Sequence, residues 1–199
     1  MRRTQTARTG VALAAVALLT GNPLAAQTPA VGETTSMAKF TLTSTNLKDG
    51  GSIAEAQVFN GFGCKGGNVS PALAWAGAPT GTRSFALLVH DPDAPTGSGW
   101  WHWIVYNIPA ATTALPAGAG DPQSKLMPPG AVQARTDYGT VGYGGPCPPP
   151  GKPHHYHFQL YALKVDKLDV PADASAALIG FNVRAHSLGQ AELVALYGR

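Results

Sequence analysis

Charged residues are scarce in this sequence of 199 residues: Asp, Glu, Lys and Arg make up 13% of it, and only two residues are cysteine. Because 44% of the residues are apolar, and because the glycines and prolines follow no fixed period, the composition excludes a disordered chain, a collagen and a coiled coil. The formal net charge of +3 comes entirely from Arg2, Arg3 and Arg8, since the remaining 11 basic groups balance the 11 acidic ones. A neutral remainder predicts no nucleic-acid partner.

Several short motifs of common enzyme classes are also absent. The sequence has no GxxxxGK(S/T) phosphate-binding loop, no GxGxxG that opens a helix after a strand, no HExxH and no GxSxG. These absences argue against a P-loop nucleotidase, a dinucleotide enzyme, a zincin and an α/β-hydrolase. We expect no cofactor.

The first 26 residues have the three parts of a secretory signal. The arginines form the charged region, residues 10–19 form the apolar region, and Leu24-Ala25-Ala26 forms the exit, so we predict cleavage after Ala26. A membrane anchor would need ~20 uninterrupted apolar residues, and the run is interrupted at residues 20–23. No later segment is apolar enough to span a bilayer. We therefore expect a periplasmic or secreted protein, with the export route left open, a flexible lead over residues 27–38 and one domain over residues 39–199.

Short β-rich runs separated by glycine and proline turns predict a mostly β domain. Strands are expected at residues 40–43, 84–89, 101–106 and 155–161. The run 101–106 is apolar on both alternating faces, which indicates a central strand covered on each side. Near the C-terminus, helical spacing after Asp173 as the cap predicts one helix, and a second helix is expected around residues 188–193.

Two acidic residues follow a predicted strand. Asp91 and Asp93 belong to the pentapeptide DPDAP, whose prolines restrict the backbone and suit a site, although an ordinary turn has the same composition.

His102 lies among tryptophans, so its imidazole is expected to be buried and to need a partner. The carboxylate of Asp91 could supply it, and the alternative is a core histidine without a functional role.

A loop rich in glycine and proline spans residues 142–151 and could form a nest of amide groups for an anion. After it come His154, His155 and His157. On a strand His155 and His157 share one face while His154 shares the other with Tyr156, so three histidines cannot bind one metal together. His155 and His157 could be two metal ligands on one face, or they could be solvated surface side chains. We predict no metal site.

Cys64 and Cys147 both lie in flexible loops, at residues 61–67 and 142–151. In an oxidising compartment they could form a disulfide, and the alternative is two small buried thiols. Sequence spacing does not decide between the two states.

A family resemblance is carried by three segments taken in order. They are residues 61–110, which contain DPDAP and WWHW, residues 136–165, which contain GYGGPCPPPG and HHYHF, and the terminal AELVALYGR. The sequence resembles the phosphatidylethanolamine-binding protein family, specifically its bacterial YbhB/YbcL branch of Raf kinase inhibitor-like proteins. The resemblance implies a single-domain antiparallel β-sandwich with short peripheral helices and a small anion pocket, and a cis peptide between Ala94 and Pro95. Carried over by position, the pocket residues are Asp91, Asp93, Pro95, His102, Gly145, Pro146, His154 and Tyr156. His155 stands where many members have arginine.

The expected function is therefore non-catalytic binding of phosphate, acetate or a phospholipid headgroup, with imidazole N–H groups and loop amides near Gly145 as donors. Two alternatives remain: a protein-interaction module that modulates a protease or a signalling partner, and an uncharacterised hydrolase that uses Asp91 with His102 or His154. No residue in the pattern is an activated nucleophile. A homodimer and an unknown protein partner also stay open.

Overall fold

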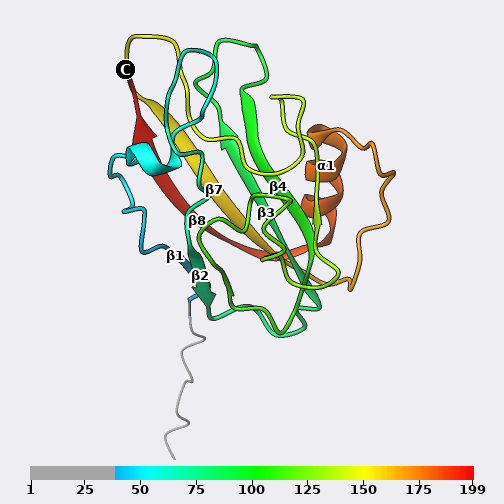
Figure 1. The fold of residues 1–199 in the computed structure, drawn as a ribbon. Helices are drawn as coiled ribbons and strands as arrows, with labels where there is room; N and C mark the ends of the chain where they lie inside the picture. Colours follow the sequence, from blue (N-terminus) through cyan, green and yellow to red (C-terminus); the bar gives the residue numbers. More distant parts are fainter. Residues whose placement is uncertain (1–38) are drawn as a thin grey trace, which may run out of the picture. The chain divides into compact units, whose positions relative to one another are not determined.

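Two antiparallel sheets make up most of the structure, a computed structural model that describes residues 39–199 (Figure 1). The larger sheet has the strand order β6 (Val132–Gln133), β4 (Trp100–Pro109), β3 (Ser84–Asp91), β7 (His154–Leu163) and β8 (Ser187–Tyr197). The smaller sheet has the order β1 (Thr41–Thr43), β2 (Leu73–Ala76) and β5 (Ala114–Leu115). A 3-10 turn, η1, spans Glu55–Gln57. The expected signal sequence, its cleavage after Ala26 and the lead over residues 27–38 lie outside the described residues.

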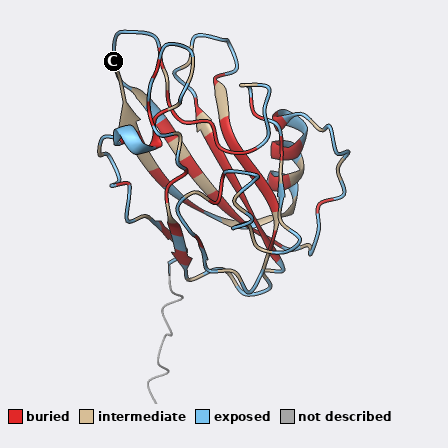
Figure 2. Cartoon of the chain, viewed as in Figure 1, coloured by how far each residue is buried: buried red, intermediate tan, exposed pale blue. Residues whose placement is uncertain are grey.

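The two central strands of the larger sheet are buried on both faces, as the apolar run at residues 101–106 predicted. In β3, Leu87 and Val89 face the smaller sheet, whereas Leu88 between them belongs to a second apolar cluster on the opposite face. Figure 2 shows the buried residues concentrated along these strands. Side chains that alternate between two covered faces leave no place for charge, which explains why β3 and β4 carry so little of it.

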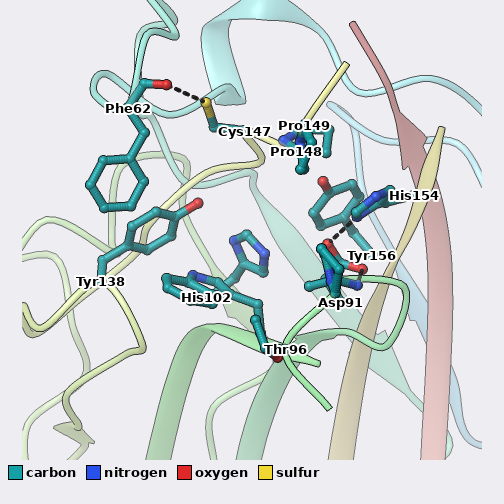
Figure 3. A pocket seen from close by; sticks show the side chains of 13 residues that line it. Phe62, Asp91, Thr96, His102, Tyr138, Cys147, Pro148, Pro149, His154 and Tyr156 are labelled. Carbon is teal, nitrogen blue, oxygen red and sulfur yellow. Dashed lines mark hydrogen bonds and ion pairs between the residues drawn. The ribbon is translucent and has the colours of Figure 1, made fainter. Parts of the chain in front are cut away.

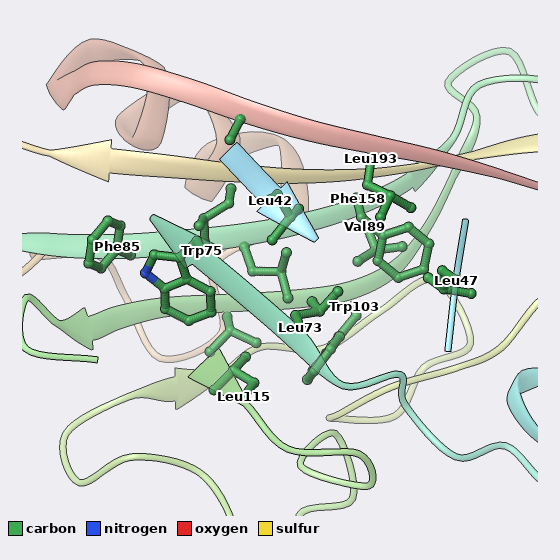
Figure 4. Packing of buried hydrophobic residues seen from close by; sticks show 14 of the residues in the cluster. Leu42, Leu47, Leu73, Trp75, Phe85, Val89, Trp103, Leu115, Phe158 and Leu193 are labelled. Atoms are coloured by element: carbon green, nitrogen blue, oxygen red, sulfur yellow. The ribbon is translucent and has the colours of Figure 1, made fainter. Parts of the chain in front are cut away.

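The main core lies between the two sheets. Trp75 of the smaller sheet packs edge-to-face on Phe85 of the larger one, with ring centroids 5.5 Å apart. Figure 4 shows this layer, in which side chains from β1, β2 and β5 meet those of β3, β4, β7 and β8: Leu42, Leu73, Trp75 and Leu115 on one side and Phe85, Val89, Trp103, Phe158 and Leu193 on the other. The mostly β sandwich expected from the sequence is thus confirmed.

One α-helix, α1 (Ala176–His186), covers the other face of the larger sheet through Ile179 and Val183. Its cap is Ser175, whose hydroxyl accepts from the Leu178 amide at 3.2 Å. The expectation that Asp173 caps this helix was wrong, because residues 171–174 form a turn closed by a hydrogen bond from the Ala174 amide to the Pro171 carbonyl. Among residues 39–199 no helix has the length and apolarity to cross a membrane.

The second helix expected around residues 188–193 is also wrong, because this segment lies in strand β8. Its residues pair with β7 along the whole strand, from Tyr197 opposite His154 to Ser187 opposite Leu163. Ala191, Leu193 and Ala195 are buried and alternate with less buried residues, so the segment has the period of a strand. Pairing with the long strand β7 outweighs the helical preference of the Ala, Leu and Glu residues in this segment.

Candidate functional site

A pocket of about 210 Å³ lies at one end of the larger sheet. Since neighbouring strands run in opposite directions, the end of β3 and the beginnings of β4 and β7 meet there, with Asp91 paired to Trp100 and His90 to His157. Two loops complete the wall (Figure 3). The lining residues are Phe62, Asp91, Ala94, Pro95, Thr96, Trp100, His102, Tyr138, Cys147, Pro148, Pro149, His154 and Tyr156.

Five of the eight residues carried over from the family motifs line this pocket: Asp91, Pro95, His102, His154 and Tyr156. Asp93, Gly145 and Pro146 do not. Asp93 is outside the lining, and its carboxylate accepts from the His155 amide at 2.8 Å and contacts the His155 ring at 2.7 Å. These bonds with His155 lower the pKa of the Asp93 carboxyl. The predicted faces of β7 are correct, since Tyr156 is buried while His155 is exposed.

The amides around Gly145 are engaged inside the protein, contrary to the expected anion nest. The Gly145 amide donates to the side-chain oxygen of Asn68, and the Gly144 amide donates to the His102 carbonyl, both at 2.8 Å. A Cβ at Gly145 would lie 2.0 Å from the Gln57 carbonyl oxygen. Glycine is therefore required at this position for close backbone packing, and its amide is not available to a ligand.

Asp91 is held by three donors at the end of β3. One carboxylate oxygen accepts from the amides of Asp93 and Ala94, at 2.9 and 3.1 Å, and the other lies 2.7 Å from Nδ1 of His154. The Asp91 side chain is buried, and its partner is His154 rather than His102 as the sequence suggested. Because a carboxylate only accepts, Nδ1 of His154 carries hydrogen and its Nε2 is the atom free to meet a ligand. The peptide bond between Ala94 and Pro95 is trans, like every other described one, in contrast to the cis bond expected from the resemblance.

His102 lines the pocket and is buried. Its Nδ1 lies 2.7 Å from the Gly144 carbonyl, which only accepts, so the ring hydrogen is on Nδ1. Burial lowers the pKa of His102 to about 4, although the Gly144 and Gly145 carbonyls and the Asp91 charge oppose this shift. At neutral pH the ring is therefore uncharged, and Nε2 is an acceptor rather than the N–H donor expected from the sequence.

Unpartnered polar atoms gather in this pocket. In the described part of the chain, four buried side-chain nitrogen or oxygen atoms have no hydrogen-bond partner: Nε1 of Trp75, Nε1 of Trp100, Nε2 of His102 and the hydroxyl of Tyr156. All except the first belong to pocket residues. Since a buried polar group without a partner costs about 1–3 kcal/mol, three of them together point to a binding site.

Aromatic residues from two loops close the pocket, and sequence reasoning missed them. Tyr138 stacks on Phe59 with ring centroids 4.0 Å apart, meets the His102 ring edge-to-face and donates its hydroxyl to the Gly145 carbonyl. Phe62 is 67% exposed and adopts a left-handed backbone, with φ of 52°. The glycines on either side of Phe62 were the only local signal for it in the sequence. Nothing near Tyr138 in the sequence distinguishes it from a turn residue.

A disulfide joins the two loops, since Cys64 and Cys147 are bridged with their Cα atoms 6.0 Å apart. The Phe59 amide also donates to the Pro146 carbonyl at 3.0 Å. The wall that carries Phe62 is thereby attached to the wall that carries Pro148 and Pro149. Pro148 and Pro149 were also missed from the sequence. They lie inside the loop motif at residues 142–151 but have no polar side-chain group that would indicate a binding role.

The hydroxyl groups in the pocket are poor nucleophiles. Burial raises the pKa values of Tyr138 and Tyr156 well above that of free tyrosine, and the Asp91 charge raises both further. Thr96 donates its hydroxyl to the Gly99 carbonyl. Among residues 39–199 no group of three His, Cys, Asp or Glu side chains is placed to hold a metal ion. The described side chains thus supply donors, acceptors and apolar surface.

Comparison with known proteins adds relatives that share this architecture. A family model described as phosphatidylethanolamine-binding protein matches residues 43–198. The UPF0098 protein YbcL of Escherichia coli K12 is 52% identical over 161 residues, which cover 80% of this chain and 88% of YbcL. YbhB of the same organism is 49% identical over 156 residues, which cover 78% of this chain and 98% of YbhB.

Two solved structures are also similar. The crystal structure of E. coli YbcL, described as a new member of the mammalian PEBP family, has a TM-score of 0.79 and covers 81% of this chain and 99% of its own. A phosphatidylethanolamine-binding protein homologue from Chlamydia trachomatis has a TM-score of 0.67 at 31% identity and covers 80% of this chain and 97% of its own. The matched family segment includes every residue that lines the pocket.

Proposed function

This chain belongs to the phosphatidylethanolamine-binding protein family, in its YbhB/YbcL branch, and we propose that its pocket binds a small oxyanion without converting it. The oxyanion would be inorganic phosphate, a carboxylate or a phosphorylated headgroup, and the protein would be exported through its first 26 residues. The observation that carries the proposal is the group of unpartnered polar atoms in the pocket, contributed by Trp100, His102 and Tyr156.

Two of these groups supply hydrogen to an anionic oxygen. The indole Nε1 of Trp100 is a donor only, and the Tyr156 hydroxyl donates as well as accepts. The third polar group is Nε2 of His154, which is left for the ligand because Asp91 accepts from Nδ1. The Asp91 charge is already met by its three donors, so it does not prevent an anion from binding beside His154.

The walls of the pocket are apolar. Their apolar residues include Phe62, Pro148 and Pro149, which Figure 3 labels, and also Pro95 and Trp100. A pocket with a few convergent polar groups and an otherwise apolar lining is typical of small-molecule sites. This arrangement suits an oxyanion that is attached to a small organic group.

The same residues support binding over covalent catalysis. Asp91 and His154 are paired at 2.7 Å as a base and its orienting carboxylate would be. However, the nearby hydroxyls belong to two tyrosines with raised pKa values and to Thr96, which donates to a carbonyl. No described pocket residue is activated for attack.

Calorimetric titration with inorganic phosphate tests this function. We expect saturable binding to the wild type, and we expect Tyr156→Phe and His154→Ala each to weaken it by about tenfold, because each removes one hydrogen bond to a charged ligand. His157→Ala is the matched control: His157 lies on the same strand but faces away and bonds to Glu192. Equal affinity in all four proteins would place the anion elsewhere, and the absence of any heat of binding in the wild type would refute the function.

A further inference from the structure

We propose that the pocket selects an oxyanion that carries its own proton, such as a phosphate monoester or inorganic phosphate, and discriminates against an oxyanion that carries none, such as a sulfate ester. The inference rests on the proposed function and narrows its candidate ligands, because an ionised carboxylate, like a sulfate ester, carries no proton. It comes from a buried pocket group without a partner that needs a donor rather than an acceptor, the imidazole of His102.

The polarity of His102 is set by its contact with the chain. The Gly144 carbonyl lies 2.7 Å from Nδ1 and requires the hydrogen there, so a neutral ring has only a lone pair on Nε2. Nε2 is buried and has no partner in the described structure. The ring itself is only 3% exposed, so bulk water does not readily supply the missing donor.

The neutral form persists over the working range of pH. Burial lowers the pKa of His102 to about 4, which keeps Nε2 an acceptor at neutral and mildly acidic pH. The His102 ring contacts two tyrosine rings edge-to-face, and its centroid lies 5.1 Å from that of Tyr156 and 5.6 Å from that of Tyr138. Tyr138 donates its hydroxyl to the Gly145 carbonyl and is therefore not the donor for Nε2.

A single small ligand meets both kinds of group. Trp100 and Tyr156 line the pocket and carry unpartnered groups that can donate hydrogen, whereas His102 carries an unpartnered lone pair on Nε2. Figure 3 shows His102 and Tyr156 in this pocket. A phosphate monoanion has oxygens that accept and a hydroxyl that donates, so it satisfies all three. A sulfate ester has oxygens only, and it places a lone pair against Nε2 of His102.

The size of the effect follows from the cost of an unpaired buried group. Sites built around a hydrogen bond to a ligand hydroxyl reject analogues that lack it, by roughly tenfold or more. Phosphodiesters without another donor belong to the rejected class, because both of their remaining oxygens are unprotonated. A headgroup that supplies an ammonium hydrogen in place of the missing hydroxyl belongs to the accepted class.

Methyl phosphate and methyl sulfate form the decisive pair of probes. At about pH 5, below the second pKa of a phosphate ester near 6, both are tetrahedral monoanions of similar shape, and they differ by one proton. Calorimetric titration of the wild type should show methyl phosphate binding at least about tenfold more tightly than methyl sulfate. Dimethyl phosphate should bind as weakly as methyl sulfate, and inorganic phosphate shows whether the ester group contributes.

The His102→Asn variant locates the discrimination. The asparagine amide nitrogen can replace Nδ1 as the donor to the Gly144 carbonyl, but nothing replaces Nε2, so we expect the two esters to bind within about twofold of each other. If this variant does not fold, the wild-type comparison still decides.

Equal affinities for methyl phosphate and methyl sulfate in the wild type, or tighter binding of methyl sulfate, would overturn this inference and leave the anion pocket intact. The same holds if His102→Asn folds and keeps the full discrimination. If the wild type binds none of the four probes, the proposed function fails as well.

Discussion

At the scale of single residues, the two pocket histidines differ because their hydrogen-bond partners differ. His154 is paired with a carboxylate, whereas His102 is paired with a carbonyl and lies between aromatic rings. Tyr156 and Trp100 lie beside them with polar atoms that have no partner in the protein. The chemistry of the pocket is therefore set by which atom each side chain leaves free.

His102 should make the folded state sensitive to acid. Its pKa is about 4 when folded, against an ordinary value of 6.5, so the unfolded chain binds a proton first as the pH falls. The free energy of unfolding should therefore be unaffected by His102 above pH 6.5 and decrease by roughly 3 kcal/mol as the pH falls to about 4.

Urea unfolding at a series of pH values measures this contribution as the difference between the wild type and His102→Asn. The slope of stability against pH in this interval should be shallower in the variant. His157→Ala, which removes a half-buried histidine of the same sheet outside the pocket, serves as the control and should keep the contribution of His102. Parallel curves for the wild type and His102→Asn would show that His102 titrates normally.

At the scale of elements, the pocket depends on two loops that the strands do not hold together by themselves. The loop at residues 59–67 follows η1, and the loop at residues 142–151 precedes β7. Their connection consists of the Cys64–Cys147 bridge and backbone hydrogen bonds such as that from Phe59 to Pro146. The bridge closes a chain segment with a sequence separation of 83, so it restricts the unfolded chain considerably.

Replacing both cysteines, Cys64→Ser with Cys147→Ser, should lower the free energy of unfolding by about 2–5 kcal/mol, because the unfolded chain regains the entropy that the bridge removed. Urea unfolding of the two proteins measures the difference. Adding a reductant should lower the midpoint of the wild type and leave that of the double variant unchanged. Identical midpoints for the oxidised wild type and the double variant would contradict a stabilising bridge.

At the scale of the whole molecule, the distribution of charge separates the N-terminal segment from the rest. All of the excess positive charge belongs to Arg2, Arg3 and Arg8, and the remaining chain is balanced. This pattern supports our proposal that residues 1–26 direct export and are then removed.

The intact mass of the protein recovered from the periplasm or the medium should match a chain that begins at Gln27. Small side chains at the exit are needed for cleavage, so Ala26→Arg should leave the longer precursor, while Thr28→Ser, just beyond the site, should be processed normally. Recovery of the wild type at the mass of all 199 residues would refute removal of the segment.

Much of the fold could be predicted from the sequence, because local patterns carry it. The run from Trp101 to Tyr106 is apolar on both faces, and this alone indicates a central strand. The alternation after His154 predicts which histidines of β7 are exposed. The motifs around Asp91 and Cys147 were sufficient to identify the family and five residues of the pocket wall.

Hydrogen-bond partners were decided only by the tertiary structure, because the atoms involved come from distant parts of the chain. Asp91 binds His154, 63 residues away, and His102 binds a carbonyl 42 residues away. These pairings determine which ring nitrogen faces the ligand and whether it donates or accepts. The same reason explains strand β8, where pairing with β7 outweighs a helical composition. Local periodicity determined which residues are buried, and the pairing of distant segments determined what the buried polar atoms can bind.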